Sequence, residues 1–163
     1  MSSKQRKILG IDPGYGRVGF GVIQEKKKDL HYINHGCIET SQDLELSDRL
    51  IQIKDALDKV LAEYQPDMAS VEELFFCKNV KTAIDVGQAR GVILLSLSEY
   101  GLDVDEFTPK EIKSTLTGKG NADKKQVQEM VKLQLDLGRK PSQDDAADAL
   151  AVALCSSLKN KYQ

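Results

Sequence analysis

The sequence has few of the features that mark secreted, zinc-binding or membrane proteins. It contains only three cysteines, Cys37, Cys77 and Cys155, and no two of them form a C-x-x-C pair. This odd, scattered set predicts reduced thiols and excludes a disulfide framework and a zinc ribbon. No apolar run approaches the roughly 18–20 residues of a membrane span. Asp12 interrupts the N-terminal apolar run too early for a signal peptide. We therefore expect a cytoplasmic protein that does not associate with membranes.

The chain has little net charge, but its charges are unevenly distributed. With 163 residues, 40% hydrophobic and 29% charged, the composition predicts one globular domain over residues 1–163. A net charge of -2 argues against a protein that simply coats nucleic acid. Residues 110–140 are nevertheless rich in bases, and screening over about 8–10 Å isolates such a patch. This segment either holds a polyanion or is a solvated helix face.

Hydrophobic periodicity and turn residues predict the order βββαβαβααα. The predicted strands span 7–12, 18–24, 30–39, 68–72 and 102–107. The predicted helices span 47–64, 79–100, a segment opened by the capping box 108–111, 122–137 and 143–158. Ser47 is the expected N-cap of the first helix. Three successive strands imply an antiparallel meander, and strands that alternate with helices imply parallel pairing. The two histidines, His31 and His35, are interpreted as ordinary strand residues.

Four carboxylates occur in apolar strings, where an ionised group without a partner is costly. Asp12 ends the first strand, Glu72 ends the fourth, and Asp145 and Asp148 lie in the last helix. The two aspartates are three residues apart, so they leave one helix face. If the four converge, their oxygens suit a hard cation such as Mg²⁺ or Mn²⁺. Two such ions about 3.5–4 Å apart clamp the attacking and leaving oxygens of a phosphodiester.

Each of these acids also has a purely structural interpretation. Asp12 precedes Pro-Gly and is a typical turn residue. Asp145 lies near a helix N-terminus, where acids are favourable. Glu72 is followed by Glu73, and strand alternation sends the two side chains to opposite faces, so only one of them joins a cluster.

Four segments together resemble the RuvC-type Holliday-junction resolvases. They are ILGIDPG, SVEELFFCKN, VGQARGV and DDAADALAVA, in the family's order and spacing, and the resemblance covers about residues 7–158. It implies an RNase H-like fold of the integrase superfamily, with a mixed five-stranded sheet flanked by helices. It further implies a Mg²⁺-dependent homodimeric endonuclease, with two ions in each site and Mn²⁺ as a substitute. This enzyme nicks four-way DNA symmetrically in recombination and repair, together with the RuvA–RuvB branch-migration complex.

The resemblance also implies roles for individual residues. The catalytic, metal-binding carboxylates fall on Asp12, Glu72, Asp145 and Asp148. The basic residues near the scissile strand fall on Lys113 and Lys124, with Lys119 and Lys125 as further DNA-binding candidates. The aromatic residue that probes the junction falls on Phe75. Stacking on an unpaired base contributes about 1–3 kcal/mol; the alternative is packing, to which we assign Phe76.

The helix predicted over 79–100 carries small residues at every fourth position, Ala83, Gly87 and Gly91. Glycine inside a helix costs about 1 kcal/mol relative to alanine, so a close backbone approach is the expected reason. The neighbour is either the protein's own sheet or a second subunit. Arg90 either contacts DNA or pairs with an interface acid. Two other functions remain as alternatives: a junction-binding module without catalysis, and an RNase H-like nuclease that acts on RNA-containing substrates.

Overall fold

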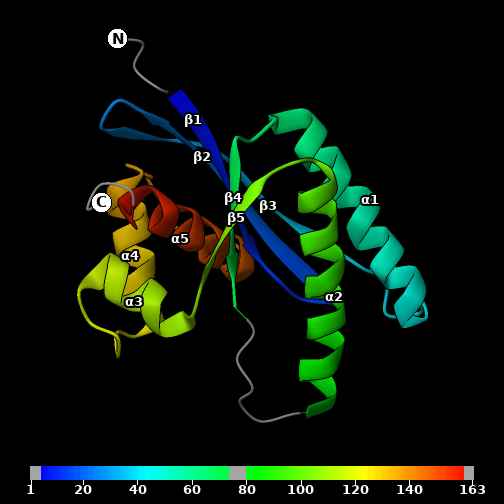
Figure 1. The fold of residues 1–163 in the computed structure, drawn as a ribbon. Helices are drawn as coiled ribbons and strands as arrows, with labels where there is room; N and C mark the ends of the chain where they lie inside the picture. Colours follow the sequence, from blue (N-terminus) through cyan, green and yellow to red (C-terminus); the bar gives the residue numbers. More distant parts are fainter. Residues whose placement is uncertain (1–4, 74–79, 160–163) are drawn as a thin grey trace.

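A mixed β-sheet lies between two groups of helices (Figure 1). The computed structural model describes residues 5–73 and 80–159, and within them the sheet has five strands in the order β3-β2-β1-β4-β5. The strands are β1 (Gln5–Asp12), β2 (Arg17–Lys26), β3 (Asp29–Glu39), β4 (Met68–Glu72) and β5 (Asp103–Phe107). β1, β2 and β3 pair antiparallel, whereas β4 pairs parallel with both β1 and β5. The predicted meander and parallel strands are both confirmed, and β1 is central.

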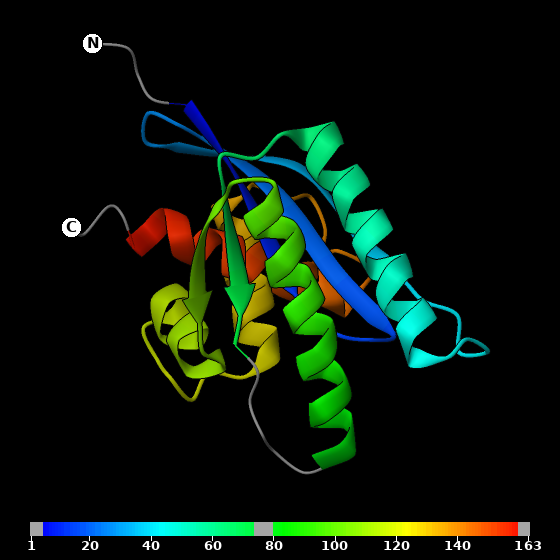
Figure 2. The ribbon, with the colours of Figure 1, turned by 45° about the vertical axis from the view of Figure 1, so that its right-hand side comes forward.

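The helices cover the two faces of the sheet unequally. They are α1 (Leu46–Tyr64), α2 (Val80–Glu99), α3 (Pro109–Thr117), α4 (Lys124–Gln134) and α5 (Asp144–Lys159). Figures 1 and 2 show α1 and α2 on one face and the other three helices on the opposite face. Each face has its own hydrophobic core, and β1 contributes Leu9 and Ile11 to one and Ile8 to the other. Among the described residues, no helix is long and apolar enough for a membrane crossing.

Two helix boundaries differ from the predictions. Ser47 is not an N-cap: α1 begins at Leu46, its N-cap is Glu45, and Ser47 lies exposed in the first turn. The backbone of the half-buried Leu46 is already helical, so the helix begins before Ser47. The helix predicted over 122–137 is shorter, because Asp123 is its N-cap and Asp136, with a φ of 50°, lies outside the helical region.

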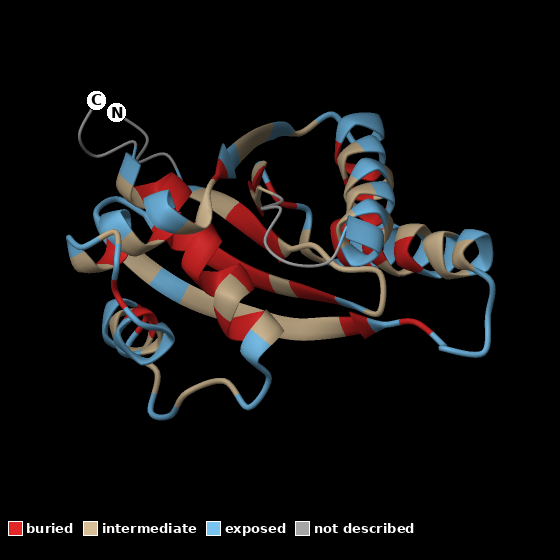
Figure 3. Ribbon diagram, turned by 90° about the horizontal axis from the view of Figure 1, so that it is seen from below, coloured by how far each residue is buried: buried red, intermediate tan, exposed pale blue. Residues whose placement is uncertain are grey.

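Helix α5 packs directly on the backbones of the central strands. Its residues from Ala149 to Ser157 are all buried (Figure 3). A Cβ atom on Gly10 would lie 2.0 Å from the carbonyl oxygen of Ala149, and one on Gly19 would lie 2.0 Å from that of Asp145. The Ser70 hydroxyl of β4 donates a 2.7 Å hydrogen bond to the Val152 carbonyl. The helix position therefore depends on strand residues that lack side chains.

We predict that Gly10→Ala and Gly19→Ala each destabilise the protein by about 1–3 kcal/mol or more, because the added methyl group displaces α5. Urea unfolding measures the change in free energy. Gly138→Ala is the matched control, since a Cβ there has no neighbour within 4 Å. Equal stability of all three variants would contradict the close packing of α5.

Candidate metal centre

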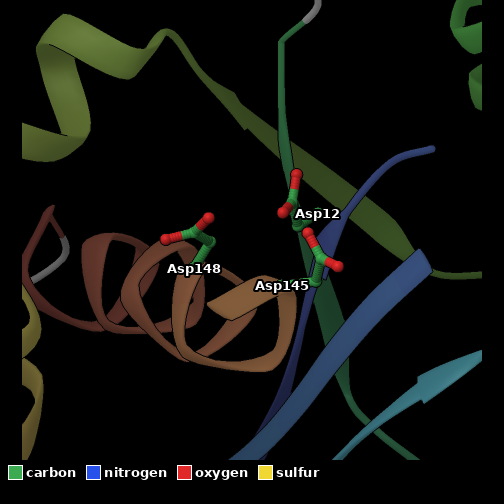
Figure 4. A group of neighbouring side chains, drawn as sticks. All are labelled: Asp12, Asp145 and Asp148. Atoms are coloured by element: carbon green, nitrogen blue, oxygen red, sulfur yellow. The ribbon is translucent and has the colours of Figure 1, made fainter. Parts of the chain in front are cut away.

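The carboxylates come together where the central parallel strands end. Asp12 is the last residue of β1 and Glu72 the last of β4, and the preceding residues Ile11 and Val71 are paired in register. Because parallel strands end at the same edge of a sheet, these two side chains are neighbours. Helix α5 crosses this edge with Asp145 and Asp148 in its first turns (Figure 4). The face of α5 that they share also carries the buried Ala149 and Val152.

Three of the four predicted acids form a tight cluster. Asp12, Asp145 and Asp148 each offer one carboxylate oxygen, and these oxygens lie within 4.8 Å of one another. Glu72 is not a member of this three-oxygen group, but its carboxyl group shares a hydrogen bond with that of Asp12. The arrangement is an all-oxygen site of half-buried ligands, which suits Mg²⁺ or Mn²⁺.

Crowding and burial change the acidity of these groups. Burial, together with the charges of Glu72, Asp148 and Asp145, raises the pKa of Asp12 from 3.8 to about 9, and burial is the largest cause. Burial is also the largest cause of the raised pKa values of Glu72 and Asp148. At neutral pH and without a cation, Asp12 is therefore protonated and shares its proton with Glu72. A divalent cation held by these carboxylates would replace that proton and relieve the repulsion.

Two lysines adjoin the acids. A hollow of about 250 Å³ is lined by Glu72, Asp148, Lys113 and Lys124, together with apolar residues. The ammonium nitrogen of Lys124 lies 3.6 Å from Oδ2 of Asp148 and 3.3 Å from Oδ2 of Asp144. Burial lowers the pKa of Lys124, but these carboxylates outweigh it, so the net shift is upward. Both lysines therefore present positive charge beside the acidic cluster.

Capping boxes orient the helices that carry these lysines. In α3 the Thr108 hydroxyl accepts from the Glu111 amide (3.1 Å), and the Glu111 carboxylate accepts from the Thr108 amide (2.8 Å). In α4, Asp123 and Gln126 form the same reciprocal pair, at 2.8 and 2.9 Å. The predicted capping box at 108–111 is thus confirmed. Lys124 is the first residue of its helix, directly after the cap.

The other sequence-predicted residues lie elsewhere. Lys119 and Lys125 are exposed and do not belong to the lining of the lysine hollow within the described residues. Phe75 and Phe76 fall outside the described residues, as does Cys77. His31 and His35 lie in β3, as predicted, and His35 Nδ1 shares a 2.7 Å hydrogen bond with the Tyr32 hydroxyl.

Two pairings escaped the sequence analysis. Arg90 forms an ion pair with Glu106 of the neighbouring strand β5, and it lines a second hollow of about 160 Å³ beside Asp12 and Glu72. Asp144, in the first turn of α5, pairs with Lys124. In each pair the two residues are at least 16 positions apart in the sequence. The sequence indicated only that Arg90 and Asp144 lie in segments that carry the family resemblance.

The sheet order, with acids at the end of its central strand and on a helix crossing it, defines the RNase H-like class of nucleases. The description "Crossover junction endodeoxyribonuclease RuvC" belongs to the family that matches residues 8–156. The chain is therefore a member of the RuvC family of crossover junction endodeoxyribonucleases.

Individual relatives agree with this assignment. The chain is 51% identical to the crossover junction endodeoxyribonuclease RuvC of Thermosipho melanesiensis over 156 residues, covering 96% of this chain and 99% of the relative. It is 49% identical to that of Thermotoga petrophila, with 95% and 94% covered. The structure of Thermus thermophilus RuvC in complex with a Holliday junction substrate has a TM-score of 0.90 and 32% identity, and 96% of each chain is covered.

We predict that Asp12→Asn raises the melting temperature of the metal-free protein at neutral pH. The amide replaces a carboxyl group that the folded protein must keep protonated. We expect the free energy of unfolding to rise by about 2 kcal/mol, which raises the melting temperature of a chain of this size by about 4–8 °C. Folding raises the pKa of Asp12 from 3.8 to about 9. The contribution of the protonated Asp12 to folding stability is therefore fully present below pH about 4 and is lost as the pH rises towards 9.

The predicted stabilisation by Asp12→Asn is tested by measuring melting temperatures in EDTA between pH 5 and 9, at about one-unit steps. The wild-type value should fall more steeply with pH than that of Asp12→Asn, and added Mg²⁺ should stabilise the wild type more than the variant. Parallel pH profiles, or a less stable variant at pH 8, would contradict the shared-proton description.

Proposed function

We propose that this chain resolves four-way DNA junctions by paired symmetric nicks, through metal-dependent hydrolysis of phosphodiester bonds. The observation that carries the proposal is the cluster of Asp12, Asp145 and Asp148, with Glu72 hydrogen-bonded to it and two lysines beside it. Family membership supplies the substrate class, since the Thermus thermophilus relative is described in complex with a Holliday junction substrate. The proposal includes a cytoplasmic role in recombination and repair beside the RuvA–RuvB complex.

The acidic cluster would hold two Mg²⁺ ions, with Mn²⁺ as a substitute. Asp12, on the central strand, would contribute to holding both ions, and Glu72, Asp145 and Asp148 would supply the other carboxylate ligands. Burial and the crowding of carboxylates, which together raise the pKa of Asp12 to about 9, support this, since positive charge is what such a cluster lacks. Bound ions supply positive charge that lowers the pKa of a water molecule and neutralises the phosphate.

The lysines act on the phosphate itself. Lys113 and Lys124 face the same hollow as Glu72 and Asp148, so a phosphate there contacts both ammonium groups. They hold the scissile phosphate in line with the acids and stabilise the charge that develops on its oxygens. Lys119 and Lys125, exposed farther along the same basic region, would contact neighbouring phosphates. Phe75 would stack on a base at the opened junction.

The proposal requires two active sites, and α2 offers a surface for a second copy. Its buried side is formed by Ala89, Ile93 and Leu97, whereas Ile84 and Leu95 are 52% and 51% exposed. Gly91 lies on the exposed side, and a Cβ there would meet nothing within 4 Å in the described structure. The protein's own sheet therefore does not explain Gly91, and close packing against a second α2 helix does.

Asp12→Asn and Glu72→Gln should each slow junction nicking by at least about 100-fold while leaving junction binding within a few-fold, because they remove ligands and not DNA contacts. Glu63→Gln, at an exposed position of α1, is the matched control, and its rate should stay near that of the wild type. Nicking of an immobile four-way junction, with product ends mapped on all four strands over a range of Mg²⁺ and Mn²⁺ concentrations, measures the rates.

Other outcomes of this assay decide between the alternatives. Near-normal nicking by Asp12→Asn would refute the catalytic assignment. A wild type that binds junctions but forms no product with either metal would be a binding module. Faster cleavage of an RNA–DNA hybrid than of the junction would indicate a different RNase H-like nuclease.

The dimer makes a separate prediction. Ile84→Asp and Leu95→Asp place charge on the exposed side of α2, and each should weaken self-association at least about tenfold, since a charge buried between subunits lacks a partner. Sedimentation equilibrium measures the dissociation constant. Leu133→Asp on α4, where the side chain is 71% exposed, is the control. Unchanged association of both α2 variants would exclude this surface as the dimer interface.

A further inference from the structure

Three hollows that share lining residues adjoin the acidic cluster, and together we call them the groove. The lysine hollow and the Arg90 hollow share Glu72 and Pro109 in their linings. The Arg90 hollow in turn shares Val86 with a third hollow, of about 500 Å³. The third hollow is lined by Gly14, Tyr15, Gly16, Gln42, Arg49 and Val86. The acids are therefore flanked by Lys113 and Lys124 at one end of the groove and by Arg49 at the other.

The Arg49 side chain is held in one orientation at this far end. Its Nε donates a 2.9 Å hydrogen bond to the Thr40 hydroxyl, and that hydroxyl donates a 2.6 Å bond to the Tyr15 carbonyl. The guanidinium carbon also lies 4.8 Å from the centre of the Tyr15 ring, a cation–π contact. Thr40 is itself 9% exposed, so the anchor is part of the folded core. Among residues 5–73 and 80–159, neither terminal nitrogen of Arg49 has a hydrogen-bond partner.

Arg49 differs from three of the other four arginines of the chain in its electrostatic environment. Arg6 pairs with Glu25, Arg17 with Glu39, and Arg90 with Glu106. Arg139, like Arg49, has no carboxylate partner among the described residues, but it lines a separate hollow, away from the acids. Within residues 5–73 and 80–159, Arg49 forms no ion pair with a carboxylate. An oriented guanidinium without a carboxylate is suited to bind an anion with two parallel N–H groups, as phosphate binding requires.

We propose that Arg49 binds a backbone phosphate of the DNA strand being cut, on the opposite side of the scissile phosphate from Lys113 and Lys124. Thr40 and Tyr15 are positioning residues that hold the guanidinium. The inference rests on the proposed function and adds a second point of attachment. With cationic contacts on both sides of the acids, the strand is prevented from sliding along the groove, and the scissile phosphate stays in register with the acids.

The test compares Arg49→Ala with Lys59→Ala, which removes the same charge from an exposed position on the same helix ten residues away, about 15 Å along its axis. Junction affinity is measured in an Asp12→Asn background between about 50 and 200 mM salt. Loss of one phosphate contact should reduce the slope of log affinity against log salt by about 0.7–0.9 for Arg49→Ala and leave that of Lys59→Ala unchanged.

Nicking rates supply the second measurement. With Asp12 intact, Arg49→Ala should nick at least about fivefold more slowly than Lys59→Ala, because the strand is less well aligned. Arg49→Lys keeps the charge, so the slope of its log affinity against log salt should equal that of Lys59→Ala. Its nicking rate should lie between the rates of Arg49→Ala and Lys59→Ala. Thr40→Val should also slow nicking without changing the salt slope, since the charge remains but its orientation is lost.

Other results overturn the inference. The inference is refuted if Arg49→Ala has the same salt slope and the same nicking rate as Lys59→Ala. It is also refuted if the only effect of Arg49→Ala is a lower melting temperature. Failure of the proposed function is distinguishable, because it would be seen as a wild type that does not nick the junction at all. In that case the salt slope still reports whether Arg49 contacts a phosphate.

Discussion

The contact between the backbone of α5 and the backbones of β1 and β2 sets the geometry of the whole site. Gly10 and Gly19 leave no Cβ atoms in the way, so the carbonyl oxygens of Ala149 and Asp145 rest where side chains would otherwise be. This approach carries Asp145 and Asp148 to within 4.8 Å of Asp12. Three acids at such distances repel one another, so the burial of α5 on the sheet must supply the free energy that keeps them together.

The site therefore stores an electrostatic cost that divalent cations relieve. Burial and the neighbouring carboxylates raise the pKa of Asp12 to about 9, so without cations Asp12 keeps a proton, shared with Glu72, that reduces the negative charge. Lys124 offsets part of the negative charge through its ion pairs with Asp148 and Asp144, and its charge also acts on Glu72. A cluster with uncompensated charge at its centre and cationic side chains at its edge accommodates cations and a phosphodiester at the same time, and this is the combination that hydrolysis of a DNA strand needs.

The groove extends this arrangement to both sides of the acids. At one end, Lys113 and Lys124 are carried by short helices whose capping boxes fix where they start. At the other end, Thr40 and Tyr15 hold Arg49 by a hydrogen bond and a ring contact. The exposed side of α2, which we propose as the dimer surface, would place two such grooves on one junction. In this proposal, strand positioning and subunit pairing use surfaces separate from the acids, so each can be altered without removing the chemistry.

Much of this was already determined by the sequence alone. Apolar periodicity determined the element order, and acids in apolar strings identified Asp12, Glu72, Asp145 and Asp148, since such contexts imply burial. The three-residue spacing placed two of them on one helix face. Only the tertiary structure decided that Glu72 stands beside the three-aspartate group, that Asp144 and Asp148 share Lys124, that Arg90 pairs with Glu106, and that Arg49 is oriented without a carboxylate partner among the described residues. Periodicity and spacing describe one element at a time, whereas each of these contacts joins different elements and depends on how closely the glycines let them approach.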